Sequence, residues 1–234
     1  MIIKSTFLLC VFLTFVSAEI RQPRDVADVV KEELEALASI VQGRILVAHD
    51  DLDNALTTFK TNSINVASQG TISIQQLQQT IDAQLQQIKD FAHSADVDIS
   101  ACTNIREQTL NRFPDILIGE LNTYIDNIVA KASSTTDDGT YLVDIVINKV
   151  HNLDFQLSQC GEDLLCINPL LTEIELDKVR LPQSIETEVQ AVESVLTNLR
   201  ISVQSNTDWC VSQYISGAFD ILRDIQNCAN HLAG

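Results

Sequence analysis

The stretch IETEVQAVESVLTNLRISV, residues 185–203, decides the fold class of this chain. Its apolar residues recur at alternating steps of four and three: Ile185, Val189, Val192, Leu196, Leu199 and Val203. This spacing places the apolar side chains on one stripe of an α-helix and is typical of helices that pack along a shared seam. A half-buried strand would require alternation of period two, which we do not find. The stretch therefore predicts a long helix buried against other helices.

Similar stripes recur along most of the chain and predict an all-α protein. We expect a helical hairpin over residues 24–112, followed by helices at about 115–132, 141–160, 169–180 and 183–232. Short connections between long helices favour an antiparallel bundle. A helix over residues 24–61 would be about 57 Å long at 1.5 Å per residue. The predicted fold is an elongated antiparallel bundle with heptad-type packing, stapled by disulfides.

The expected breaks rest on residues that disfavour helices. Residues 62–71 contain Asn65, Ser68 and Gly70 and are predicted to form the turn of the hairpin. Residues 133–140, SSTTDDGT, are predicted to form a loop. Pro114 and Pro182 should each end a helix, because proline lacks the backbone N–H and disfavours a helical residue before it.

The N-terminus predicts export from the cell. Lys4 precedes an apolar run over residues 7–16, and Ser17-Ala18 ends in small residues, so we expect a signal peptide over residues 1–18 with cleavage before Glu19. Residues 19–234 would then form a single secreted helical domain. The apolar run is too short to span a bilayer, and no later stretch contains 18 apolar residues. We therefore predict no membrane span.

The charge of the chain limits its partners. The sequence has 32 acidic and 15 Lys and Arg residues, a net charge of −17. Removal of Lys4 with the signal peptide leaves 14 − 32 = −18. A surface of this sign repels nucleic acids and anionic lipids, so we predict no nucleic-acid partner. It is compatible with simple solvation or with a basic partner.

Five cysteines follow the predicted signal peptide and are disulfide candidates: Cys102, Cys160, Cys166, Cys210 and Cys228. In an oxidising compartment, five cysteines form two disulfides and leave one thiol, which is either buried or joins a second chain in a dimer. If the chain folds back near Pro182, Cys160 lies closest to Cys210 and Cys166 is second, and Cys102 with Cys228 is the natural remaining pair. The alternative is a local bridge between Cys160 and Cys166, which requires a loop around Gly161.

No motif predicts chemistry at a site. Nucleophile-elbow, Walker, dinucleotide-binding and zinc-protease patterns are absent, and the histidines (His49, His93, His151 and His231) stand apart from one another. Cys228-x-x-His231 has metal-ligand spacing but no second pair, and Asp51-x-Asp53 fails as a calcium loop. Trp209, beside Cys210, is expected to pack in the core. We predict no catalytic, cofactor or metal residues, and no enzyme.

The cysteine pattern resembles that of the insect TsetseEP-domain family, secreted helical proteins of flies and mosquitoes. Cys102 follows a long predicted hairpin, then come CGEDLLCINPLL at residues 160–171, Leu181-Pro182, and Cys210 and Cys228 in a terminal helix. The resemblance covers about residues 26–232 and implies no enzymatic activity. It also implies a gut, haemolymph or gland product with a role in defence. The glutamate-proline repeats of the namesake protein are absent here.

Two functions remain after this elimination. The first is a secreted, non-enzymatic protein that presents helical faces to a protein or a microbial surface. The second is an extracellular carrier of a lipid or another hydrophobic ligand within or between its helices. The narrow apolar stripe favours the first, because such a stripe is typical of a packing seam rather than of a face that lies on lipid.

Overall fold

The chain folds as a long rod of helices. The computed structural model describes residues 23–233, so the predicted signal peptide lies outside the described residues. It contains four helices: α1 (Pro23–Ser94), α2 (Ser100–Asp144), α3 (Ile147–Cys160) and α4 (Leu164–Ala233). No strand occurs in this part of the chain. The prediction of an elongated all-α bundle is confirmed.

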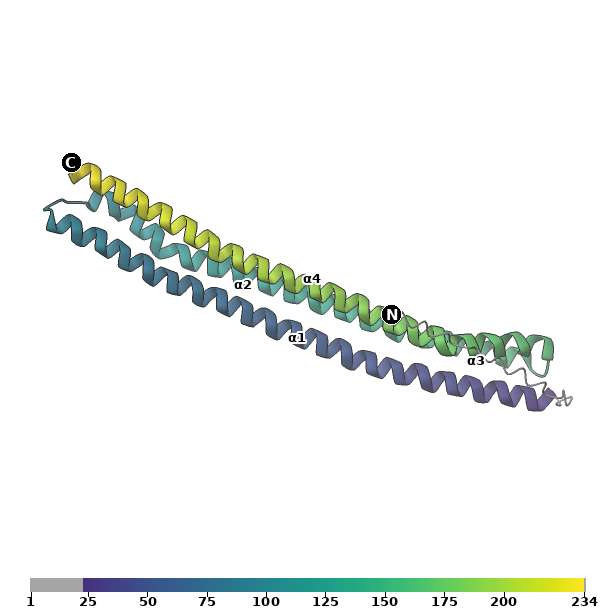
Figure 1. Ribbon diagram of the computed structural model, residues 1–234. Coiled ribbons are helices and arrows are strands. Elements are labelled where there is room, and N and C mark those ends of the chain that lie inside the picture. The colour runs from purple at the N-terminus through teal and green to yellow at the C-terminus, as the bar shows by residue number, and fades with distance from the viewer. Residues whose placement is uncertain (1–22, 234) are drawn as a thin grey trace, which may run out of the picture.

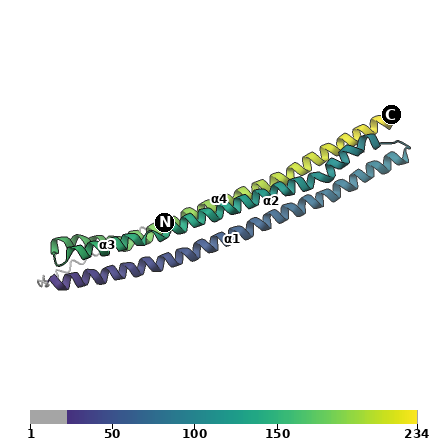
Figure 2. The ribbon, with the colours of Figure 1, turned by 180° about the vertical axis from the view of Figure 1, so that it is seen from behind.

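Three rods lie side by side along the molecule (Figure 1). The first rod is α1, the second is α2 followed by α3, and the third is α4. The second rod runs back along the first, and the third reverses again, so α1 and α4 point in the same direction (Figure 2). Helix α1, with 72 residues, is about 108 Å long at 1.5 Å per residue.

One continuous core runs through the rod. Each helix contributes a stripe of apolar side chains that is closed to solvent, and the cluster extends from Val30 on α1 to Ile225 near the end of α4. Leu37, Leu121 and Ile174 are fully buried within it. Burial of each such side chain stabilises the folded state by about 1.5–3 kcal/mol. These repeated contacts hold the rods together along their length.

The predicted turn over residues 62–71 is wrong, because α1 continues through it without a break. The small residues of this segment lie on the buried stripe: Ser63 is fully buried and Ala67 nearly so. A Cβ atom at Gly70 would lie 2.4 Å from the Thr207 methyl group of α4. Small side chains here allow two helices to approach closely, and they do not form a turn.

The predicted loop over residues 133–140 is also wrong, and for the same reason. Thr136 and Gly139 face the core of α2, and a Cβ atom at Gly139 would lie 2.4 Å from the Val192 side chain of α4. The Thr136 hydroxyl donates to the carbonyl of Ala132 at 3.0 Å, so this polar group is satisfied within the helix.

The helices also continue through their prolines, against prediction. Pro114 lies inside α2, and Pro169 and Pro182 lie inside α4, so the expected ends at 112 and 180 are not helix ends. A proline in a helix interior costs about 3 kcal/mol. Buried apolar neighbours on both sides, such as Leu110 and Leu117 around Pro114, offset this cost through packing.

The true breaks are short. Residues 95–99 reverse the chain between α1 and α2, with Asp96 at a φ of 54°. Residues 145–146 separate α2 from α3, and residues 161–163 reverse the chain again, with Gly161 at a φ of 57°. The predicted helix end at residue 160 is confirmed.

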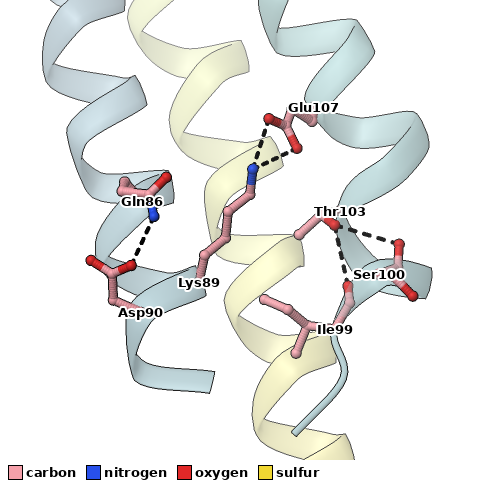
Figure 3. Close-up of polar contacts among 7 residues, drawn as sticks. All are labelled: Gln86, Lys89, Asp90, Ile99, Ser100, Thr103 and Glu107. Carbon is pink, nitrogen blue, oxygen red and sulfur yellow. Dashed lines mark hydrogen bonds and ion pairs between the residues drawn. The ribbon is translucent and has the colours of Figure 1, made fainter. Parts of the chain in front are cut away.

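A salt bridge secures the first reversal. Lys89 of α1 donates to both carboxylate oxygens of Glu107 on α2, at 2.7 and 2.8 Å (Figure 3).

Hydrogen bonds also order the start of α2. The Thr103 hydroxyl donates to the carbonyl oxygen of Ile99 at 3.3 Å, and Asp98 accepts the Ser100 N–H at 2.9 Å. The Ser100 N–H stabilises the ionised carboxyl and lowers the pKa of Asp98.

Two disulfides close the ends of the rod. Cys102 at the start of α2 is bonded to Cys228 near the end of α4, which confirms that predicted pair. Cys160 is bonded to Cys166, so the expected pair of Cys160 with Cys210 is wrong and the local alternative is right. The physical reason is the sharp reversal at Gly161, which brings the two Cα atoms within 5.4 Å.

Two glycines of α2 should respond oppositely to alanine. Gly139→Ala should destabilise the protein by about 1–3 kcal/mol, because the new methyl group would collide with Val192. Gly119→Ala is the matched control in the same helix: no atom lies within 4 Å of its Cβ position, and the better helix former should stabilise by about 0.8–1 kcal/mol. Urea denaturation measures both, and equal effects would contradict the close approach.

The two disulfides should differ in their contribution to stability. Cys102–Cys228 spans 126 residues and Cys160–Cys166 spans 6, so chain-entropy arguments assign them about 4.9 and about 2.2 kcal/mol. The double variants C102A/C228A and C160A/C166A should lose stability in that order when unfolded by urea. The reverse order would contradict the argument that the Cys102–Cys228 disulfide stabilises the protein by restricting the unfolded chain.

Candidate interaction surface

The odd cysteine lies in the core. Cys210 forms no disulfide and is 1% exposed, which is the first of the two alternatives predicted for the unpaired thiol. Burial raises the pKa of the Cys210 thiol, and the nearby Glu120 carboxylate raises it further. A neutral buried thiol is a poor nucleophile. The disulfide-linked dimer stays a prediction, and it would require the bundle to open at this position.

The histidines do not converge. His49 Nε2 lies 2.8 Å from a carboxylate oxygen of Asp144 and links α1 to α2, whereas His93, His151 and His231 are exposed. Cys228 is held in a disulfide, so it offers no thiolate to a metal beside His231. Within residues 23–233 no group of three potential ligands is arranged to hold a metal ion.

Two ionisable side chains are buried without a full set of partners. The Tyr214 hydroxyl has no hydrogen-bond partner, and burial raises the pKa of Tyr214 to about 12. Its ring packs against Phe113, with the ring centres 5.6 Å apart. Asp177 is 4% exposed, and its Oδ2 lies 4.0 Å from Lys149 Nζ without a hydrogen bond. Lys149 is paired with Glu173 instead.

A belt of carboxylates surrounds the rod near its middle. Its three sections lie at the same height along the rod, because Gly139 of α2 faces both Val192 of α4 and Leu52 of α1. The sections are residues 45–59 of α1, 132–148 at the α2–α3 junction and 181–199 of α4. Each section carries three acidic residues and no Lys or Arg. This acidic belt consists of Asp50, Asp51, Asp53, Asp137, Asp138, Asp144, Glu186, Glu188 and Glu193.

The charge of the acidic belt is not neutralised within the chain. All nine carboxylates except Glu188 are exposed. In the described part of the chain none of the nine forms an ion pair with Lys or Arg, and Asp144 alone among them lies within 4 Å of a histidine nitrogen, that of His49. Carboxylates gathered in this way repel one another and attract cations.

A groove follows α1 and α4 through the acidic belt. Two adjoining depressions of about 220 and 420 Å³ share Asp51 and Glu193 and form one continuous α1–α4 groove, from Arg44 to Asn62 on α1. Its floor is apolar and its edges are polar. The floor and edges comprise Arg44, Val47, Ala48, Asp51, Asn54, Ala55, Thr58, Phe59, Asn62, Pro182, Ile185, Glu186, Val189, Gln190, Glu193, Leu196, Thr197 and Arg200.

A second groove lies on the same pair of helices near the Cys102–Cys228 disulfide. It has a volume of about 630 Å³ and is flanked by two exposed aromatic rings, Phe91 on α1 and Phe219 on α4. The rest of this Phe91–Phe219 groove is lined by side-chain amides such as Gln84 and Gln226, by the apolar Ile88, Leu222 and Ala229, and by Arg223. The prediction that Trp209 packs in the core is wrong, because its side chain lies on the outer side of α4 and is 49% exposed.

Sequence reasoning missed both grooves and the acidic belt. The net charge was visible, but three acidic segments far apart in sequence gather only when the register of the helices is known. The lack of Lys and Arg in each of the three sections was the one signal that could have identified the belt.

In the described residues, no helix is long and apolar enough to cross a membrane. The sequence matches no protein-family model, and no curated protein is found to be similar to it. Fold and surface therefore define the class: an elongated, disulfide-bonded bundle of long helices. The resemblance to the TsetseEP-domain family stays a prediction.

Removal of the buried charge at Asp177 should make stability less dependent on pH. Burial raises the pKa of Asp177, Glu173 raises it further, and Lys149 and Arg180 lower it. The folded state therefore disfavours the ionised carboxylate of Asp177. The resulting loss in the free energy of unfolding is present at neutral pH, and it disappears as the pH falls below the raised pKa and Asp177 is protonated.

Asp177→Asn should therefore stabilise the folded state at pH 7 by roughly 1 kcal/mol and raise the melting temperature. This gain should shrink as the pH falls towards 4. Asp154→Asn, an exposed carboxylate on α3 without an ion pair, is the control and should show no such trend. Thermal unfolding followed by circular dichroism from pH 4 to 8 measures both variants. A gain for Asp177→Asn that grows towards acid would contradict this assignment.

Proposed function

We propose that the protein is a secreted, non-enzymatic interaction protein that presents helical surfaces to a protein or a microbial surface. The observation that carries this proposal is the acidic belt around a rigid rod, crossed by a groove with an apolar floor. Unneutralised charge beside apolar surface is a combination that a binding partner can satisfy.

Further support comes from the disulfides and from the N-terminal sequence. Disulfides persist mainly outside the reducing cytosol, and the signal peptide predicted over residues 1–18 accounts for export. The resemblance to the TsetseEP-domain family adds the expectation of a role in insect defence, or in the gut or a secretory gland.

The test is retention of a partner from the native fluid or tissue extract. The purified, disulfide-bonded protein is immobilised and washed at physiological salt, and the same protein after reduction and alkylation serves as the control. We expect a partner that is retained only by the folded rod and that forms a complex of defined stoichiometry in size-exclusion chromatography with light scattering. If nothing is retained by the folded rod alone, the proposal fails.

One observation favours a second function, the carriage of a hydrophobic ligand. The Phe91–Phe219 groove has exposed aromatic walls and no acidic residue among those that line it. Native mass spectrometry of protein purified from its source distinguishes the two functions. A lipid or other apolar molecule that co-purifies, and that is lost from F91S/F219S, would support the carrier; an apo spectrum from the native source would exclude it.

A further inference from the structure

We infer that the α1–α4 groove binds a cationic amphipathic helix, with its apolar face on the groove floor and its Lys or Arg side chains on the acidic belt. This inference rests on the proposed function and names the chemistry of the partner. It follows from the shape of the groove, from the exposed apolar surface within it and from the charge that surrounds it.

The shape of the groove fits one helix. Its walls are two long helices that run in the same direction, and its length on α1, residues 44–62, is about 27 Å at 1.5 Å per residue. This corresponds to five turns of a helix. Side-chain ridges of a further helix pack into the furrow between two neighbouring helices, so an added helix would extend the bundle by its own packing rules.

The floor of the groove offers apolar contact in a limited area. Val47 is 51% exposed. Beside it lie Ala48, Ile185 and Val189, whose side chains are already buried in the core of the rod. An apolar stripe on the incoming helix would cover Val47 and complete this packing. The area is small, so apolar contact alone would bind weakly, and attraction between charges must supply specificity.

The charges around the groove select a cation. Asp51, Glu186 and Glu193 line it between Arg44 and Arg200, which lie at its two ends, and the other six carboxylates of the acidic belt surround the rod at the same level. The nearest Lys and Arg residues delimit the belt at both ends of each section: Arg44, Lys60, Lys131, Lys149, Arg180 and Arg200. A helix with Lys or Arg on its polar face would neutralise the carboxylates that line the groove, whereas nucleic acid or an anionic membrane would be repelled.

A second copy of this chain is a poor occupant on the same grounds. Pairing through the groove would place Asp51, Glu186 and Glu193 of one copy near the same three carboxylates of the other, in a chain with a net charge of −17. Like charges in direct opposition destabilise an interface.

The test uses the purified protein and a synthetic probe. The probe is a fluorescent 18-residue helix of Leu and Lys with the leucines on one face, and the comparison is a permuted peptide of the same composition without a leucine face. Fluorescence anisotropy at low salt measures binding to the wild type, to D51N/E193Q and to D115N/D126N. The last variant removes two exposed carboxylates from α2 outside the acidic belt, so its charge change is identical.

We expect the amphipathic probe to bind the wild type and D115N/D126N alike, within about twofold, and D51N/E193Q roughly fivefold more weakly, as the loss of two ion pairs implies. Affinity should fall with added salt. Equal binding by the two variants, or equal binding of the permuted peptide, would overturn the inference. So would dimerisation of D51N/E193Q at a concentration where the wild type is a monomer.

The two proposals fail differently. A native partner that is retained equally by the wild type and by D51N/E193Q would overturn the groove assignment and leave the interaction function standing. Absence of any partner on the folded rod would overturn the interaction function itself, whatever the synthetic probe does.

Discussion

The structure depends on one interaction, the burial of an apolar stripe from each helix against the stripes of its two neighbours. The stripe of α1 extends from Val30 to Ala92, so a slip in register at any point would move apolar side chains to the surface along the whole rod. The charge surface follows from the same register, because the three sections of the acidic belt lie at one level only when Gly139 faces Val192 and Leu52. Packing in the core therefore positions carboxylates that take no part in it.

The sequence predicted the fold class because helical periodicity is a strong signal over long stretches. It did not predict helix ends, since Gly70 and Gly139 were interpreted as turn residues when they are points of close contact between helices. The two roles cannot be separated without knowledge of what lies opposite the glycine. Pro114 gave the same difficulty: its local cost is real, but burial of neighbouring residues outweighs it, and that burial is a tertiary effect.

The disulfides show the same limit at the level of single residues. Cys102 and Cys228 were paired correctly, although by way of a wrong pairing of Cys160 with Cys210. Cys160 instead bonds to Cys166 because the chain reverses at Gly161, a local geometry that the sequence allowed but did not require. For the candidate surface, composition revealed the sign of the charge, while its location depended on the register of three distant segments.

The length of α1 has a mechanical consequence. Residue 23 and residue 233 lie at opposite ends of a rod about 108 Å long, since α1 starts at one end and α4 finishes at the other. The rod is thus a stiff spacer: whatever is tethered at one terminus is held far from whatever is tethered at the other. The α1–α4 groove and the Phe91–Phe219 groove lie on the same seam, with a further depression of about 320 Å³ at residues 66–73 of α1 between them, so two ligands bound in these grooves would be held at a fixed separation along the rod.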